Sequence, residues 1–143
     1  MKSIGSSFGN NMNNRAEESI GSAQDILTAY REGAMPARPK PWLGYLMLFV
    51  KSEASTHPVR VSEPHFEVFP EFKDASYMDR GRILLTKLMR ERLYDATCFL
   101  LTPKPSGASE MPGYVEPDPD LSVRNFLLAL RAQAQMFVEM QQP

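Results

Sequence analysis

The sequence predicts an α/β fold, in which helices alternate with the strands of an at least partly parallel sheet. Residues 42–50 form a nearly continuous apolar run, and residues 96–101 form a second one. Such runs are typical of strands that are buried on both faces. The segments around them repeat apolar residues every three or four positions, which is typical of helices. A chain of 143 residues fits one domain, so a single domain is expected over 1–143.

The first helix is expected from Asn13 or Asn14, either of which can cap it, to about Arg31. Residues 1–14 are rich in turn formers, which places the start of the helix at their end. Gly33 is placed to end the helix. The three- and four-residue spacing predicts one apolar stripe, formed by Ile20, Ala23, Leu27 and Tyr30.

A loop punctuated by prolines joins this helix to the first strand, residues 42–50. The strand is followed by residues 51–75, which are polar and broken by further prolines. Such composition predicts a loop rather than a helix or a sheet strand. Within it, a short extended piece is expected around Phe66–Phe69.

The second helix is expected from Ser76 or Tyr77 to about Tyr94. Tyr77 and four leucines give it an apolar face, and its other face is basic. The basic residues are Arg80, Arg82, Lys87, Arg90 and Arg92. The second strand, residues 96–101, follows this helix and is ended by prolines.

Residues 102–120 form a long loop, and loops of this length are usually functional or disordered. Asp120 or Ser122 can cap a last helix. Its expected apolar stripe consists of Val123, Phe126, Leu127, Leu130, Ala134 and Phe137. Two strands make a poor sheet, because three or more are normally needed. Either a short N-terminal strand escapes the pattern, or the chain begins after part of its sheet.

Charge and cysteine content narrow the possible classes. A net charge of -1 argues against binding nucleic acid by bulk charge alone, although most of the 16 Lys and Arg lie between Arg31 and Arg92. No segment approaches the ~20 apolar residues of a membrane span, and the N-terminus has no secretory signal. Cys98 is the one cysteine, so no internal disulfide or Cys-based zinc site is expected. A reducing cytoplasm is the natural expectation.

No complete catalytic motif is present in the sequence: it has no phosphate-binding loop, nucleophile elbow or His-Glu-x-x-His. His57 and His65 are isolated in polar loops, which is typical of solvated side chains. Cys98 has apolar neighbours in its strand, where a cysteine behaves as a small buried hydrophobe. Asp118 and Asp120 flank a proline and could share a cation, but such pairs are usually turn chemistry.

Several strings in the chain are distinctive in combination. They include Lys2 to Asn14 with the following Arg15-Ala16-Glu17-Glu18, Arg38-Pro39-Lys40-Pro41-Trp42-Leu43-Gly44-Tyr45, Glu63-Pro64-His65-Phe66 and Arg90-Glu91-Arg92-Leu93-Tyr94-Asp95-Ala96. Together they resemble the XhoI-type type II restriction endonucleases, from Lys2 to about Ala132. The first string resembles the segment that carries and follows the catalytic lysine of that family.

The resemblance implies a restriction-endonuclease-like PD-(D/E)xK core, which is a mixed sheet flanked by helices. Its motif places one acid at the end of a strand, and a second acid and a lysine on the next strand. Lys2 would be the lysine, and the two acids would have no counterpart because the chain starts at Met1. The chain is therefore expected to be N-terminally truncated, the C-terminal part of a restriction endonuclease that begins at its catalytic lysine.

The resemblance also implies an activity, a cofactor and partners. The complete enzyme would cut double-stranded DNA at the palindrome CTCGAG with Mg²⁺, as a symmetric homodimer, in a restriction–modification system with a cognate methyltransferase. Phosphodiester cleavage needs a metal-bound hydroxide and neutralisation of the charge that builds on the phosphate. Carboxylates hold Mg²⁺ and a lysine cannot. The isolated fragment, without the metal-binding acids, is therefore expected to be inactive.

Three alternatives to this interpretation stay open at the level of the sequence. The chain could be an inactive DNA-binding remnant, or a separate polypeptide could supply the missing acids. It could also be a helical interaction module, which would have no affinity for DNA.

The candidate catalytic residues are Lys2, Glu17 and Glu18. The two glutamates are included because a nuclease of this shape can draw an acid from its first core helix. Acids decorating a helix N-terminus, where the dipole favours them, are the more common explanation of such a pair and need no function. No metal-ligand set is assigned.

The candidate DNA contacts combine amides just past the lysine with basic side chains. Arginine that is bidentate to guanine is the commonest specific contact in the major groove. The candidates are Asn10, Asn11, Asn13, Asn14, Arg15, Arg38, Lys40, Arg80, Arg82 and Lys87.

Overall fold

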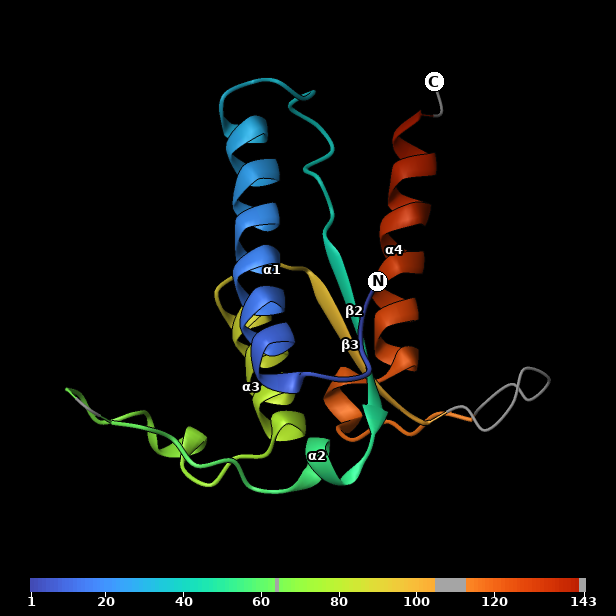
Figure 1. Cartoon of the computed structure of the whole chain (residues 1–143). Coiled ribbons are helices and arrows are strands. Elements are labelled where there is room, and N and C mark those ends of the chain that lie inside the picture. The colour runs from blue at the N-terminus through green and yellow to red at the C-terminus, as the bar shows by residue number, and fades with distance from the viewer. Residues whose placement is uncertain (64, 105–112, 142–143) are drawn as a thin grey trace.

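A computed structural model describes residues 1–63, 65–104 and 113–141, and it confirms the predicted α/β class. Helices and strands alternate along the chain (Figure 1). The strands are β1 (Lys2–Ile4), β2 (Gly44–Lys51) and β3 (Ala96–Pro103). The helices are α1 (Phe8–Arg31), α2 (Glu53–Thr56), α3 (Tyr77–Arg90) and α4 (Val123–Gln141), with 3₁₀ turns η1 (Pro70–Phe72) and η2 (Pro119–Leu121).

The three strands form one sheet in the order β1-β2-β3. Lys2 lies opposite Met47 and Ile4 lies opposite Phe49, in parallel register. α1 is the crossover that two neighbouring parallel strands require. β1 is the short N-terminal strand that escapes the sequence pattern, because three residues are too few to show a period. Both strand pairings in the described chain are parallel, so the mixed sheet expected from the resemblance is wrong for this part of the molecule.

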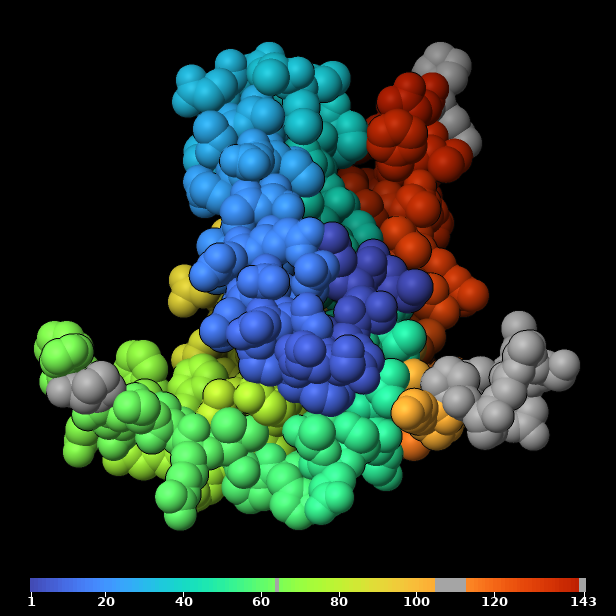
Figure 2. Space-filling model, in the orientation of Figure 1, coloured from blue at the N-terminus to red at the C-terminus, as the bar shows by residue number. Residues whose placement is uncertain are grey.

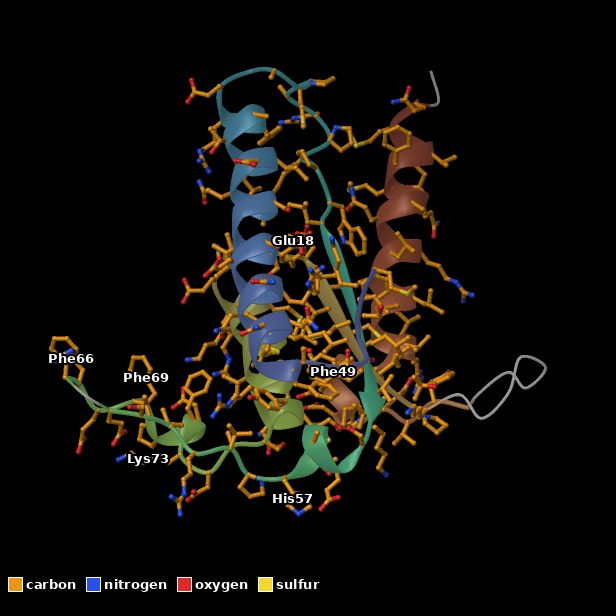
Figure 3. The ribbon with its side chains drawn as sticks, viewed as in Figure 1. Glu18, Phe49, His57, Phe66, Phe69 and Lys73 are labelled. Carbon is orange, nitrogen blue, oxygen red and sulfur yellow. The ribbon has the colours of Figure 1, made fainter. Side chains whose placement is uncertain are left out.

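α1 and α3 cover one face of the sheet, and α4 covers the other (Figure 1). On the first face, the ring centroids of Phe8 and Phe49 are 5.8 Å apart and those of Phe49 and Phe99 are 5.1 Å apart. Phe49 lies in the middle of this core (Figure 3). On the α4 face, Leu46 and Leu48 are only half-buried, because one helix covers it. The prediction that this strand is buried on both faces is therefore wrong for the α4 face.

α1 begins at Phe8, earlier than the predicted start at Asn13 or Asn14. Phe8 and Met12 are buried in the core, and this packing extends the helix through residues that favour turns by themselves. The N-cap is Ser7, with φ 48°. The end of the helix is as predicted, since Gly33 follows it with φ 78°.

The earlier start of α1 changes where its side chains lie. Glu17 and Glu18 fall in the middle of the helix rather than in its first turn, which holds no acid. Within the predicted stripe, Ala23 is buried whereas Ile20 is 47% exposed. Because neither glutamate lies in the first turn, the interaction of acids with the helix dipole does not explain this pair.

α3 begins as predicted, at Ser76 and Tyr77. The Ser76 hydroxyl accepts a hydrogen bond from the Asp79 N–H at 3.1 Å, and the Asp79 carboxylate accepts one from the Ser76 N–H, which is a capping box. The helix ends at Arg90, earlier than predicted, and Arg92 follows it with φ 57°.

The segment between α2 and α3 projects from the body of the molecule (Figure 3). Phe66 and Phe69 lie in this segment and are 87% and 69% exposed. The short extended piece predicted around 66–69 forms no strand among the described residues, because no strand lies beside it to pair with. A turn of 3₁₀ helix, η1, follows it instead.

α4 begins after Ser122, whose hydroxyl accepts a hydrogen bond from the Asn125 N–H at 3.3 Å. This confirms Ser122 as one of the two predicted caps. The Phe126 ring packs edge-on against Trp42, with centroids 5.8 Å apart. The rest of the predicted stripe is largely exposed, including Leu130 at 39% and Phe137 at 48%. None of the helices in the described chain is both long and apolar enough to span a membrane.

Candidate active site

The candidate active site is a cluster of charges between β1 and α1. Lys2 of β1 donates a hydrogen bond from its Nζ to Oε1 of Glu18 on α1. Arg15, one turn earlier on α1, forms an ion pair with the other oxygen, at 2.7 Å between Nη1 and Oε2. The two elements are in contact, because α1 folds back over the face of β1 on which Lys2 stands. We call these three residues the Lys2–Arg15–Glu18 cluster.

The cluster is open to solvent on one side. The side chains of Lys2 and Glu18 are 39% and 38% exposed, and that of Arg15 is 23% exposed. The hydrogen bond from Lys2 lowers the pKa of Glu18 below its ordinary value, and it outweighs the opposing effect of burial. The charge of Arg15 lowers this pKa further, by less than burial raises it. Glu18 is therefore ionised at neutral pH. Two cations and one carboxylate leave the cluster with one excess positive charge.

Two tyrosines lie at the base of the cluster. Tyr45 of β2 and Tyr94, which follows α3, pack edge to face with ring centroids 5.3 Å apart. Burial, followed by the neighbouring Tyr94 and Glu18, raises the pKa of Tyr45 to about 12, although Arg15 acts in the opposite direction. The Tyr94 hydroxyl donates to the backbone oxygen of Ser19 at 2.9 Å. The Tyr45 hydroxyl has no hydrogen-bond partner in the described part of the chain.

The sequence did not single out Tyr45, because it lies within an apolar run that reads as a buried strand. The one available signal was the hydroxyl itself, since a buried tyrosine usually finds a partner for it. That signal has meaning only once the surroundings of Tyr45 are known.

The structure separates the two candidate glutamates. Glu18 lies in the cluster, and Glu17 is exposed and makes no ion pair with the described residues. Adjacent residues on a helix point about 100° apart, so only one of the two can face β1. Of the candidate catalytic residues, the fold therefore brings together Lys2 and Glu18.

The candidate asparagines lie on the first turns of α1. Asn10, Asn13 and Asn14 are exposed, and Asn11 donates from its amide to the Ser6 backbone oxygen at 2.6 Å. The exposed amides are on the same helix as Arg15 and precede it. At about 100° per residue, Asn14 is the one of the three that lies nearest to the side of α1 that carries Arg15 and Glu18.

Arg38 and Lys40 lie elsewhere, in the loop before β2. Lys40 is paired with Asp95 at 3.6 Å, and the other oxygen of Asp95 accepts the Leu43 N–H at 2.8 Å. Together with Trp42 and the C-terminal half of α4, Arg38 and Lys40 line an open groove of about 790 Å³ (Figure 2).

The basic residues of α3 divide into two groups. Arg80 donates from Nη2 to the Val59 backbone oxygen at 3.0 Å and lies over the Tyr77 ring at 5.4 Å, so it is held within the fold. Arg82 and Lys87 are exposed, and with Arg90 they line a shallow basic hollow. Arg82 lies 3.8 Å from Asp118, and Lys87 lies 3.0 Å from Glu71.

The described residues hold no group of three His, Cys, Asp or Glu side chains that could bind a metal ion. The cluster has one carboxylate, Glu18, and both of its oxygens already accept from cations. Mg²⁺ prefers several hard oxygen ligands, so these residues do not by themselves fit a magnesium site.

Other sequence candidates for chemistry have structural positions. Cys98 is fully buried, as predicted, and burial raises the pKa of its thiol to about 11. The Asp118 carboxylate accepts the Asp120 N–H at 2.9 Å, which confirms the interpretation of this pair as turn chemistry. His57 and His65 are both exposed.

Comparisons with known proteins agree on one family. The family described as "Restriction endonuclease XhoI" matches residues 1–115. The type II restriction enzyme BstVI of Geobacillus stearothermophilus is 51% identical over 127 residues, which are 89% of this chain and 56% of that enzyme. The type II restriction enzyme XhoI of Xanthomonas vasicola is 48% identical over 100 residues, 70% of this chain and 40% of that enzyme. The chain thus spans about half the length of the curated relatives it matches, and no solved structure matches it.

Proposed function

The chain belongs to the XhoI restriction endonuclease family, and from this premise we propose that it forms part of a type II enzyme that cleaves both strands of DNA. The proposed target is the palindrome CTCGAG. The complete enzyme acts as a homodimer with Mg²⁺, and a cognate methyltransferase protects the sites of the host. These properties are proposed for the whole enzyme, of which the described residues form one part.

One observation carries the proposal: Lys2 stands on an outer strand of the sheet that the described residues form and is held by a carboxylate from the adjacent helix. An isolated surface lysine has no preferred orientation, whereas Glu18 and the strand fix both ends of Lys2. The cluster also remains partly exposed and carries one excess positive charge. It is therefore suited to receive a phosphate group.

In this proposal, Lys2 is the lysine of the PD-(D/E)xK motif. Its ammonium group offsets the negative charge that builds on the phosphate as water attacks and the bond to the leaving oxygen breaks. Arg15 supplies a second cation, and its planar guanidinium suits two phosphate oxygens. Glu18 acts as a positioning residue, because it holds Lys2 and Arg15 in the cluster.

Magnesium is proposed for the complete enzyme alone. Bound by the complete enzyme, the ion would lower the pKa of a water molecule and offset negative charge on the phosphate. The described residues do not fit the ion, so carboxylates outside them would have to hold it.

The proposed DNA contacts are the candidate side chains that are exposed and are not used to hold the fold together. Lys87 and Arg82 lie on the exposed face of α3, and Asn10, Asn13 and Asn14 are exposed on the first turns of α1. Arg80 has a structural role, because its guanidinium is used by Val59 and Tyr77. Arg38 and Lys40 are kept as contacts at the groove beside α4.

The test uses a chimera in which this chain is joined to the part of the BstVI relative that lies outside the matched stretch. The chimera should cut DNA that contains CTCGAG when Mg²⁺ is present. Lys2→Ala should lower the single-turnover cleavage rate by about 10²–10³-fold, because the charge on the phosphate is no longer offset. Binding in Ca²⁺ should change little, since one lysine contributes a small share of many phosphate contacts.

Glu18→Gln and Glu17→Gln form the matched pair for this experiment. Glu18→Gln should slow cleavage, and Glu17→Gln, which the structure places outside the cluster, should have a much smaller effect. Parental cleavage by Lys2→Ala would refute the placement of the active site. Absence of DNA binding by the folded chimera would favour an interaction module instead.

A further inference from the structure

The Tyr45 hydroxyl is a buried polar group that contributes no hydrogen bond to the described fold. Tyr45 is 8% exposed, and its hydroxyl finds no hydrogen-bond partner in the part of the chain that the structure describes. Buried hydroxyls are nearly always paired, and one left unpaired disfavours folding. Phenylalanine would fill the same space beside Tyr94 without that cost. A tyrosine at this position therefore suggests that its hydroxyl has a hydrogen-bond acceptor in another state of the cluster.

The strand register places Tyr45 next to the Lys2–Arg15–Glu18 cluster. Lys2 pairs with Met47, and Tyr45 lies two residues before Met47, so the side chains of Lys2 and Tyr45 point to the same face of the sheet. α1 crosses this face, because the neighbouring Tyr94 hydroxyl reaches the Ser19 backbone oxygen. Glu18 directly precedes Ser19 and is the carboxylate whose charge acts on Tyr45.

Tyr45 can act there only as a donor. Its hydroxyl keeps its proton at all working pH values, since burial raises the pKa to about 12. At rest, each oxygen of Glu18 already accepts from one cation, Lys2 or Arg15. A phosphate group that enters the cluster competes for both cations. The Glu18 carboxylate then loses its partners while it remains next to a buried, unused donor.

We propose that Tyr45 is a positioning residue of the cluster: its hydroxyl donates a hydrogen bond to Glu18 when Lys2 or Arg15 turns from Glu18 to a phosphate group of DNA. This exchange keeps Glu18 ionised and in place, so the cations return after the product leaves. The inference rests on the proposed function for the phosphate, but the exchange of hydrogen bonds belongs to these side chains alone.

The test removes one cation by substitution instead of by DNA. Lys2→Met imitates a lysine that has turned away, and the pKa of Glu18 is followed by ¹³C NMR of its side-chain carboxyl. Tyr45→Phe alone should leave this pKa nearly unchanged, because Lys2 and Arg15 still hold the carboxylate. Tyr45→Phe added to Lys2→Met should raise it further, by roughly half a unit to one unit, because a hydrogen bond to the charged form is lost.

Tyr94→Phe added to Lys2→Met is the matched control, since Tyr94 is the stacked neighbour but donates to Ser19. It should leave the pKa of Glu18 where Lys2→Met alone places it. Arg15→Gln provides a second background with the other cation removed, and it should show the same dependence on Tyr45. Circular dichroism confirms that each variant is folded before titration.

The outcomes separate the two proposals. If Tyr45→Phe has the same small effect on Glu18 in the presence and absence of each cation, the hydrogen-bond exchange is refuted, whatever the chimera does to DNA. If the coupling is found and the chimera with Lys2→Ala still cuts normally, the exchange stands and the proposed active site falls. In an active chimera, Tyr45→Phe should lower kcat about tenfold with little change in KM, as expected for a group that acts after substrate binds.

Discussion

Tyr45 and Tyr94 pack edge to face, with ring centroids 5.3 Å apart, and within the described structure only the Tyr94 hydroxyl has a hydrogen-bond acceptor. The same substitution should therefore have different effects at the two positions. Tyr94→Phe removes a buried hydrogen bond to the Ser19 carbonyl and should lower the free energy of unfolding by about 0.5–1.5 kcal/mol. Tyr45→Phe removes an unpaired hydroxyl and should leave stability unchanged or raise it.

Urea unfolding of the two variants beside the parent chain measures this difference. A loss of stability in Tyr45→Phe equal to that in Tyr94→Phe would show that the Tyr45 hydroxyl already has a partner in the resting protein.

The pH dependence of stability should carry the signature of Glu18. Its pKa in the folded chain lies below the ordinary value of 4.5, because Lys2 and then Arg15 favour the ionised form. The stabilisation is complete above the ordinary pKa and is lost as the pH falls from about 4.5 through the folded-state pKa. Glu18→Gln should thus flatten the fall of stability as the pH drops below the ordinary pKa of 4.5.

Thermal melts across this pH range test the expectation, with Glu17→Gln as the control that should keep the parental slope. Glu71 contributes in the same direction, because its own backbone N–H and Lys87 lower its pKa. Some acid sensitivity should therefore survive in Glu18→Gln. A profile identical to that of the parent would contradict the ion pairs of Glu18.

The Cys98 thiol should not react with alkylating reagents in the folded chain. It is fully buried, and burial, with a smaller effect of Glu116, raises the pKa of its thiol to about 11. At pH 8 roughly one molecule in a thousand then carries the reactive thiolate, and reagent cannot reach it. Alkylation by iodoacetamide, followed by mass spectrometry, should proceed only as fast as the chain unfolds, and quickly in concentrated urea.

Arg80 and Lys87 on α3 should show opposite phenotypes. Arg80→Ala removes the hydrogen bond to Val59 and the stacking on Tyr77, and should destabilise the fold by about 1–3 kcal/mol. Lys87→Ala should barely change stability, because its pair with Glu71 is exposed. In the chimera, Lys87→Ala should weaken DNA binding. The plot of the logarithm of the binding constant against the logarithm of the salt concentration should become less steep by about 0.9.

Fluorescence anisotropy with a CTCGAG duplex at several salt concentrations measures the second effect, and denaturant titration measures the first. Unchanged binding by Lys87→Ala would remove α3 from the proposed DNA surface. Full stability of Arg80→Ala would show that this arginine is free for DNA after all.

Where a local pattern alone decides the structure, the sequence was sufficient. The strands at 44–51 and 96–103 follow from apolar runs, and the starts of α3 and α4 follow from Ser76 and Ser122, whose hydroxyls cap the helix that they precede. Gly33 ends α1 because a glycine readily takes a positive φ. The strings shared with the XhoI-type enzymes also pointed to the family that the comparisons show.

Tertiary structure decided what depends on contacts between distant residues. β1 is a strand only because β2 offers it a partner, and α1 starts at Phe8 only because the core buries that ring. Glu18 rather than Glu17 reaches Lys2 because the packing of α1 on the sheet chooses one side of the helix. Tyr45 becomes a candidate only when its hydroxyl is seen to be buried without an acceptor. No periodicity encodes such facts, because each depends on two segments meeting in space.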